Sequence, residues 1–174
     1  MLSLNQRTVV VTGGATGIGF ALAKACGREG ANIVIGEPRQ NRLDEAVAEL
    51  EGAGIAAKAM VCDVTDIDQV EAFAEFAFDA FGEVALVLNN AGVGQGNRDA
   101  VVAADLADVH RVMNVNFFGV WHGCKVFGRR LVEQGAPAAI YNTGSENSYF
   151  VAVVNSAAYV ASKHAVYGLT DALR

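Results

Sequence analysis

The chain alternates between short runs of Val, Ile and Leu and longer segments whose apolar residues recur every three or four positions. The short runs predict strands at 7–12, 31–36, 56–62, 84–89 and 137–143, and the longer segments predict helices at 17–30, 41–53, 66–81, 108–134 and 156–173. Apolar strands that alternate with helices are typical of a parallel sheet covered on both faces, with right-handed crossovers. The pattern therefore predicts an α/β fold, a doubly wound parallel sheet in a three-layer αβα sandwich. No linker or repeat interrupts it, so we expect a single domain over residues 1–174.

The loops after the strands are the expected place for chemistry, because ligands of a doubly wound sheet bind beyond the carboxyl ends of its strands. The first loop, TGGATGIG from Thr12 to Gly19, is a glycine-rich turn from a strand into a helix. Gly13 permits a backbone conformation that other residues avoid, and Gly17 and Gly19 remove side chains where a pyrophosphate would approach a helix N-terminus. The turn predicts a dinucleotide site, and the alternative is a tight connection without a ligand.

Acidic residues end the second and third predicted strands. Glu37 can accept hydrogen bonds from both hydroxyls of an adenosine ribose and would repel a 2′-phosphate, which favours NAD over NADP. Arg39 keeps NADP open, because a guanidinium there can grip a phosphate. Asp63 is placed equally well to bind the adenine amino group or to cap its own turn.

Two further patterns follow later strands. In NNAG, Asn89 to Gly92, the asparagines can hold an open loop and Gly92 lets the chain pass close to a cofactor. Tyr159 and Lys163 stand four positions apart, which on a helix puts them on one face. A free phenol has a pKa near roughly 10, and a neighbouring ammonium favours the phenolate, so the pair predicts an acid/base group.

Taken in this order, these residues resemble the classical short-chain dehydrogenases/reductases. The matching positions are Thr12 to Gly19, Asp63, Asn89 to Gly92, Asn114 to Asn116, a serine after the fifth strand, and Tyr159 with Lys163. The resemblance covers essentially the whole chain and implies a Rossmann-type fold and NAD(P)-dependent oxidation of an alcohol or reduction of a carbonyl. The cofactor-binding residues expected on this basis are Gly13, Thr16, Gly17, Ile18, Gly19, Glu37, Asp63, Val64, Asn90, Ala91, Gly92, Tyr159 and Lys163.

The resemblance also implies the catalytic roles. Tyr159 would exchange the substrate proton, and Lys163 would favour the phenolate and bind the nicotinamide ribose. Asn116 would hold a water that relays protons to Lys163; the alternatives are an Asn116 satisfied by helix backbone, or Asn114 in its place. Ser145 would bind the substrate oxygen, with Ser148 as the alternative, and Glu146, which stands where the family usually has this serine, is expected to face solvent.

The substrate side is less defined. The loop after the fifth strand is apolar and lacks Lys and Arg, which favours an apolar or aromatic alcohol or ketone. Its apolar residues are Tyr149, Phe150, Val151, Val153 and Val154. Arg129 and Arg130 keep a 3-oxoacyl-carrier-protein reductase open, and a non-catalytic dinucleotide-binding regulator is the alternative from another class.

Composition narrows the class of protein further. Hydrophobic residues make up 52% and charged residues 18% of 174 residues, which is typical of a globular protein. The net charge of −6 without a basic run argues against nucleic-acid binding. No apolar run approaches membrane-spanning length and no signal core precedes the first strand, so we expect a cytoplasmic protein. The three cysteines and three histidines lack metal-ligand spacing, so no metal is expected: Cys26, Cys62, Cys124, His110, His122 and His164.

The resemblance implies two more properties. Members of the family continue beyond the last predicted helix, so the C-terminal part is expected to be missing from this chain. The two helices nearest the C-terminus are expected to pack in a homo-oligomer, a tetramer or dimer.

Overall fold

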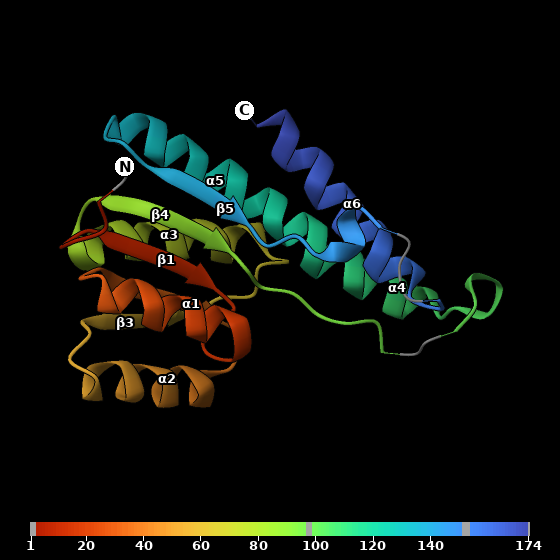
Figure 1. The fold of residues 1–174 in the computed structure, drawn as a ribbon, viewed down its shortest axis with the longest axis horizontal. Coiled ribbons are helices and arrows are strands. Elements are labelled where there is room, and N and C mark those ends of the chain that lie inside the picture. The colour runs from red at the N-terminus through yellow and green to blue at the C-terminus, as the bar shows by residue number, and fades with distance from the viewer. Residues whose placement is uncertain (1–2, 97–98, 151–153, 174) are drawn as a thin grey trace.

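A computed structural model describes residues 3–96, 99–150 and 154–173 of the chain. The sheet has five parallel strands in the order β3-β2-β1-β4-β5. Figure 1 shows β1, β4 and β5 side by side. The strands are β1 (Thr8–Thr12), β2 (Asn32–Glu37), β3 (Ala57–Val61), β4 (Val84–Asn89) and β5 (Ala139–Asn142). The order reverses between β1 and β4, so the predicted doubly wound parallel sheet is confirmed and its switch point lies where these two strands end.

Helices cover both faces of this sheet. They are α1 (Gly17–Arg28), α2 (Gln40–Gly52), α3 (Ile67–Phe81), α4 (Leu106–Met113), α5 (Gly119–Gln134) and α6 (Ala157–Ala172), with short 3₁₀ turns η1 (Val101–Ala103) and η3 (Glu146–Ser148). On one face, Val9 and Val11 of β1 pack in one cluster with residues of α1 and α2. On the other face, Val10 packs with Phe73 of α3 and Phe127 of α5.

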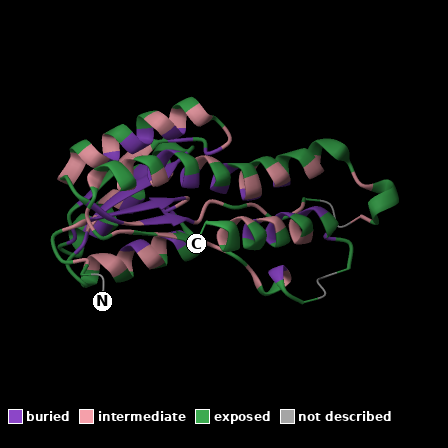
Figure 2. Cartoon of the chain, turned by 90° about the horizontal axis from the view of Figure 1, so that it is seen from above, coloured by how far each residue is buried: buried purple, intermediate pink, exposed green. Residues whose placement is uncertain are grey.

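The core follows from the alternation of side chains along the strands. All five residues of β1 are buried, because neighbouring side chains of this central strand point to opposite faces and each face carries helices. Figure 2 shows the buried residues concentrated in the sheet and the exposed ones on the outer sides of the helices. Phe73 and Phe127 meet edge-on with 6.0 Å between ring centroids. Each such buried aromatic or aliphatic side chain contributes about 1.5–3 kcal/mol to folding.

The predicted helix at 108–134 differs from the observed one in two ways. It begins at Leu106, because Asp105 accepts a hydrogen bond from the Ala107 amide and so caps the helix start. It also contains a π-helical segment, η2 (Asn114–Phe118), which separates α4 from α5 without a break in the helix. In that segment the Gly119 amide bonds to the Asn114 carbonyl, five residues back.

Candidate active site

A cleft of about 960 Å³ lies at the carboxyl ends of the strands. Every loop that follows a strand contributes to its lining. Of the residues predicted from the sequence, the lining includes Gly13, Thr16, Gly17, Ile18, Gly19, Glu37, Asp63, Val64, Asn90, Ala91, Gly92, Ser145, Tyr159 and Lys163. Among the residues predicted to bind the cofactor or to act in catalysis, Asn116 is the one that does not line the cleft.

The glycine turn forms one wall of this cleft. Gly13 has φ +62°, as predicted, and an added Cβ there would lie 2.8 Å from the Ala91 Cα. Gly17 has φ +56°, and nothing lies within 4 Å of the position of its missing Cβ, so its side of the turn is open for a ligand. At Gly19 glycine is required by close packing, because an added Cβ would lie 2.3 Å from the Gly13 carbonyl oxygen. Its small size therefore serves the packing of α1 against the turn.

The loop after β4 is attached to this turn by hydrogen bonds. Thr12 Oγ1 accepts from the amides of Asn90 and Ala91, at 3.0 and 3.2 Å. Asn90 Nδ2 donates to the carbonyls of Thr12 and Gly13, at 3.2 and 3.3 Å. Asn90 therefore holds two walls of the cleft together, which is the loop-holding role that the sequence predicts for NNAG.

Glu37 lies at the end of β2 with only 4% of its surface exposed. Its Oε1 accepts a hydrogen bond from Arg39 Nε at 2.5 Å. This bond to the carboxylate raises the pKa of the Arg39 guanidinium. Glu37, which favours NAD in the sequence analysis, and Arg39, which keeps NADP open, thus form an ion pair at the cleft.

Asp63 caps its own turn, one of the two roles left open by the sequence. Its Oδ1 accepts from the amide and hydroxyl of Thr65, at 2.9 and 2.8 Å. Asp63 also lines the cleft, so the predicted contact with adenine stays open beside this capping role. The neighbouring Val64 is buried, and its carbonyl is 2.8 Å from His122 Nδ1. His122 therefore contacts the backbone of the loop after β3.

Tyr159 and Lys163 lie on one face of α6, and both line the cleft. Lys163 is 4% exposed, and burial lowers the pKa of its ammonium. Its Nζ donates to the Thr143 carbonyl at 2.8 Å and lies 5.9 Å from the centroid of the Tyr159 ring. A positive charge so shielded from water acts strongly on neighbouring groups.

The serines after β5 differ in their surroundings. Ser145 lines the cleft, and its Oγ accepts from the Asn147 amide at 3.2 Å. Ser148 is buried, and its hydroxyl donates to the Lys163 carbonyl at 2.9 Å and accepts from the Ser145 amide. Ser148 thus ties η3 to α6, while Ser145 is the one that faces the cleft. Glu146 is exposed as expected, and it also contributes to the cleft lining.

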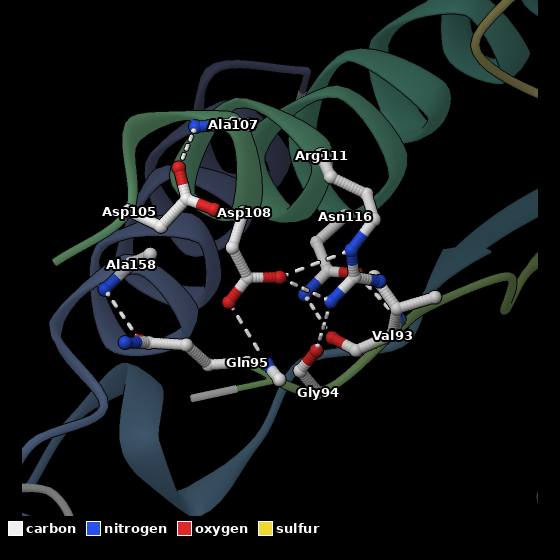
Figure 3. A network of polar contacts seen from close by, with 10 residues as sticks. Val93, Gly94, Gln95, Asp105, Ala107, Asp108, Arg111, Asn116 and Ala158 are labelled. Atoms are coloured by element: carbon white, nitrogen blue, oxygen red, sulfur yellow. Dashed lines mark hydrogen bonds and ion pairs between the residues drawn. The ribbon is translucent and has the colours of Figure 1, made fainter. Parts of the chain in front are cut away.

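Asn116 lies in η2 and is fully buried. Its Oδ1 accepts from the Val93 amide at 2.7 Å, and its Nδ2 donates to the Val93 carbonyl (Figure 3). The same Nδ2 also donates to Ser162 Oγ. The partners of Asn116 are thus a loop and a side chain of α6, rather than the backbone of its own helix. An added Cβ on Gly92 would lie 3.4 Å from Asn116 Oδ1 and 3.9 Å from Lys163 Nζ, so both polar groups lie close behind this loop.

The competing Asn114 is exposed. Asn116 is thus the buried one of the two asparagines. The water relay through Asn116 stays a prediction.

The apolar residues assigned to the substrate lie beside the cleft. Tyr149, Phe150 and Val154 are largely exposed, and none of the three belongs to the lining. Tyr149 packs edge-on against Tyr167 of α6 with 4.6 Å between ring centroids. Val151 and Val153 lie outside the described residues.

Arg129 and Arg130 both have partners within the chain. Arg129 forms an ion pair with Glu71 at 2.9 Å. The guanidinium of Arg130 lies 5.9 Å from the centroid of the Phe78 ring. Both arginines therefore have roles within the fold that do not require a carrier protein as a partner.

Several polar residues at or near the cleft were missed by the sequence analysis. Gln95 lines the cleft, and Asp108 and Arg111 of α4 bind the backbone beside it (Figure 3). The sequence offers only one signal for them, namely that Gln95 stands in the loop that begins with NNAG. Across residues 3–96, 99–150 and 154–173, no His, Cys, Asp or Glu group is arranged to hold a metal ion. In the same ranges no helix has the length and apolarity needed to span a bilayer.

Comparison with known proteins identifies the family of this chain. The family model described as "short chain dehydrogenase" matches residues 7–174. The chain is 42% identical over 166 residues to "Probable oxidoreductase EphD" of Mycobacterium tuberculosis, which covers 95% of this chain and 28% of that protein.

Two solved structures have the same fold. One is a short chain dehydrogenase/reductase from Burkholderia phymatum in complex with NAD, 35% identical with a TM-score of 0.94, covering 99% of this chain and 60% of that chain. The other is a metagenomic short-chain oxidoreductase in complex with NADP, 30% identical with a TM-score of 0.89, covering 98% of this chain and 76% of that chain. The chain thus spans only part of the length of each of these proteins.

Proposed function

The chain belongs to the short-chain dehydrogenase/reductase family, and we propose that it is an oxidoreductase that interconverts a secondary alcohol and a ketone with a nicotinamide dinucleotide. The observation that carries the proposal is the common cleft: Tyr159 and Lys163 line the same cavity as the glycine turn. A proton-transfer pair beside a dinucleotide site is the arrangement that alcohol oxidation requires.

The cleft fits a dinucleotide. The Cβ side of Gly17 is open toward the start of α1, where backbone amides can bind a pyrophosphate. We assign the adenosine end to Glu37, Asp63 and Val64, and the nicotinamide end to Asn90–Gly92, Tyr159 and Lys163. When bound, the dinucleotide supplies the hydride acceptor for oxidation or the hydride donor for reduction.

In this proposal, Tyr159 holds the proton that the substrate oxygen gains or loses. The buried ammonium of Lys163 lies 5.9 Å from the centroid of the Tyr159 ring and supplies a poorly screened positive charge next to it. Ser145 positions the substrate oxygen by a hydrogen bond, which its place in the cleft lining supports. Asn116 supports the wall of the site through its bonds to Val93.

We propose NAD as the preferred cofactor. Glu37 holds Arg39 in an ion pair, so the guanidinium that would bind a 2′-phosphate is already engaged. The carboxylate is also close to where that phosphate would lie, and it would repel it. NAD has hydroxyls in that place, and a carboxylate binds them.

The substrate, assembly and location that we propose rest on weaker observations. The exposed Tyr149, Phe150 and Val154 beside the cleft support a substrate with an apolar or aromatic part. Exposed apolar side chains along α4 and α5 support a homo-oligomer. The three cysteines are free, which supports a cytoplasmic location. The proposed single domain over residues 1–174 is supported by one sheet that includes strands from β1 to β5.

The decisive test is the substitution Tyr159→Phe, assayed with a panel of secondary alcohols by nicotinamide absorbance. Loss of the hydroxyl is expected to lower kcat by about 10²- to 10⁴-fold, the usual contribution of general acid–base catalysis. The Kd for NAD should change little, because the ring remains. Tyr167→Phe, on the same helix, is the matched control and should keep its activity. A wild-type protein that binds NAD but turns over no alcohol or ketone would instead support the non-catalytic binder.

A further inference from the structure

The first turn of α6 is capped by a residue from another part of the chain. Ser156 occupies the N-cap position, but its side chain makes no capping hydrogen bond. Gln95 Oε1 accepts instead from the Ala158 amide at 3.2 Å, across a separation of 63 residues (Figure 3). The amide two positions after the N-cap is one of those that a side-chain cap normally satisfies. Gln95 therefore takes the role that Ser156 leaves open.

Gln95 can do this because the backbone on both sides of it is held in place. Arg111 Nη2 donates to the Gly94 carbonyl at 2.9 Å, and Asp108 Oδ2 accepts from the Gly96 amide at the same distance. Arg111 and Asp108 are themselves paired at 2.6 Å. Two glycines would otherwise leave this segment with wide conformational freedom. The clamp from α4 therefore presents the Gln95 side chain to the start of α6.

These contacts connect the two ends of the candidate site. The loop that starts with Asn90 and Ala91 includes Gln95, whose side chain bonds to the Ala158 amide. The next residue of α6 is Tyr159. We propose that Gln95 is a positioning residue that keeps the first turn of α6 folded and thereby keeps Tyr159 at the cleft. The proposal rests on the proposed function, in which Tyr159 exchanges the substrate proton.

A first-turn amide without its partner makes the helix end fray, and fraying moves Tyr159 more than it moves Lys163, one turn further into the helix. The position of Tyr159 affects proton transfer, whereas dinucleotide binding depends mainly on the glycine turn. Loss of the cap should therefore lower kcat with little change in the Kd for NAD.

Three variants test this. Gln95→Leu removes the acceptor while keeping a side chain of similar size. Gln95→Glu keeps an acceptor, and a carboxylate is favourable at a helix N-terminus. Gln134→Leu is the structural control, because Gln134 also bonds backbone far away in sequence, the amide and carbonyl of Val84 at the opposite end of β4.

The first measurement is amide hydrogen exchange at Ala158, which does not depend on activity. In Gln95→Leu this amide should exchange about tenfold faster, the loss expected for a missing cap. In Gln95→Glu and Gln134→Leu its exchange should stay near the wild-type rate. Unchanged exchange in Gln95→Leu would overturn the cap itself.

The second measurement separates kcat from the Kd for NAD. Gln95→Leu should lose about tenfold in kcat at nearly constant Kd, and Gln95→Glu should recover most of it. Gln134→Leu should lower Tm and leave kcat unchanged. An equal loss of kcat in Gln95→Leu and Gln134→Leu, or faster exchange with unchanged kcat, would overturn the positioning role. If the wild-type protein turns over nothing, the proposed function fails, and exchange at Ala158 still decides whether Gln95 caps α6.

Discussion

At the scale of single residues, Lys163 carries an electrostatic cost in the candidate site. Its ammonium is almost fully buried, and burial lowers its pKa. The Thr143 carbonyl compensates part of this cost by accepting a hydrogen bond. What the site gains is a positive charge beside the Tyr159 ring with little water to screen it.

Glu37 gives a residue-scale prediction about cofactor choice. Replacing it by serine removes the carboxylate that binds Arg39 and would repel a 2′-phosphate. The variant Glu37→Ser should bind NAD about tenfold more weakly and NADP about tenfold more tightly, since hydrogen bonds to charged groups contribute about 1.5–3 kcal/mol. Fluorescence titration with NADH and NADPH measures both.

The control for this substitution is Glu49→Ser. Glu49 also holds a cation, Lys24, at 2.7 Å, but it lies outside the cleft. Its loss should leave the preference between the two nucleotides unchanged. A Glu37→Ser variant that keeps the wild-type preference would contradict the role assigned to Glu37.

At the scale of helices and strands, the sequence predicts all five strands and their order along the chain, with ends within two residues. This is because each strand is a short, largely apolar run that ends next to a glycine, an asparagine or an acidic residue. It does not predict the π-helical segment at Asn114–Phe118, because the residues of this segment follow the same apolar period as the helices around it. The segment contains Asn116, whose partners Val93 and Ser162 lie far away in sequence. For the same reason the Gln95 cap could not be found, since its partner Ala158 is set by packing.

Two glycines of α5 give an element-scale prediction. An added Cβ on Gly123 would lie 2.1 Å from the buried Asn89 Oδ1, whereas one on Gly128 would meet only Ile140 at 3.8 Å. Gly123→Ala should therefore destabilise the protein by about 1–3 kcal/mol through overpacking. Gly128→Ala should stabilise it by about 0.5–1 kcal/mol, because alanine has the higher helix propensity. Urea denaturation measures both, and equal effects of the two substitutions would show that this contact is not rigid.

At the scale of the whole molecule, one outer face of the helical layer is unusually apolar. Leu106, Phe118, Trp121 and Val132 are exposed along α4, η2 and α5. Phe117 packs against both Phe118 and Trp121, with ring centroids 5.1 and 5.9 Å apart. Clustered exposed aromatic residues are typical of a surface that binds another protein, and the proposed homo-oligomer supplies a second copy of this face.

Trp121→Glu is expected to convert the oligomer to a monomer, because a carboxylate at the centre of this face would be buried without a partner. Sedimentation velocity at several concentrations measures the change. Val102→Glu is the control, since Val102 is 98% exposed on η1, away from the aromatic cluster. A Trp121→Glu variant that sediments like the wild type would exclude this face.

The π-helical segment also has a consequence for how a single helix serves two regions. A π turn holds one residue more than an α turn, and each residue of an α-helix adds about 100° of rotation. The insertion therefore changes the angular phase of α5 relative to α4, so that Asp108 and Arg111 can face the loop while Phe127 faces the sheet. One continuous helix can therefore direct its first part toward the loop and its second part toward the hydrophobic core.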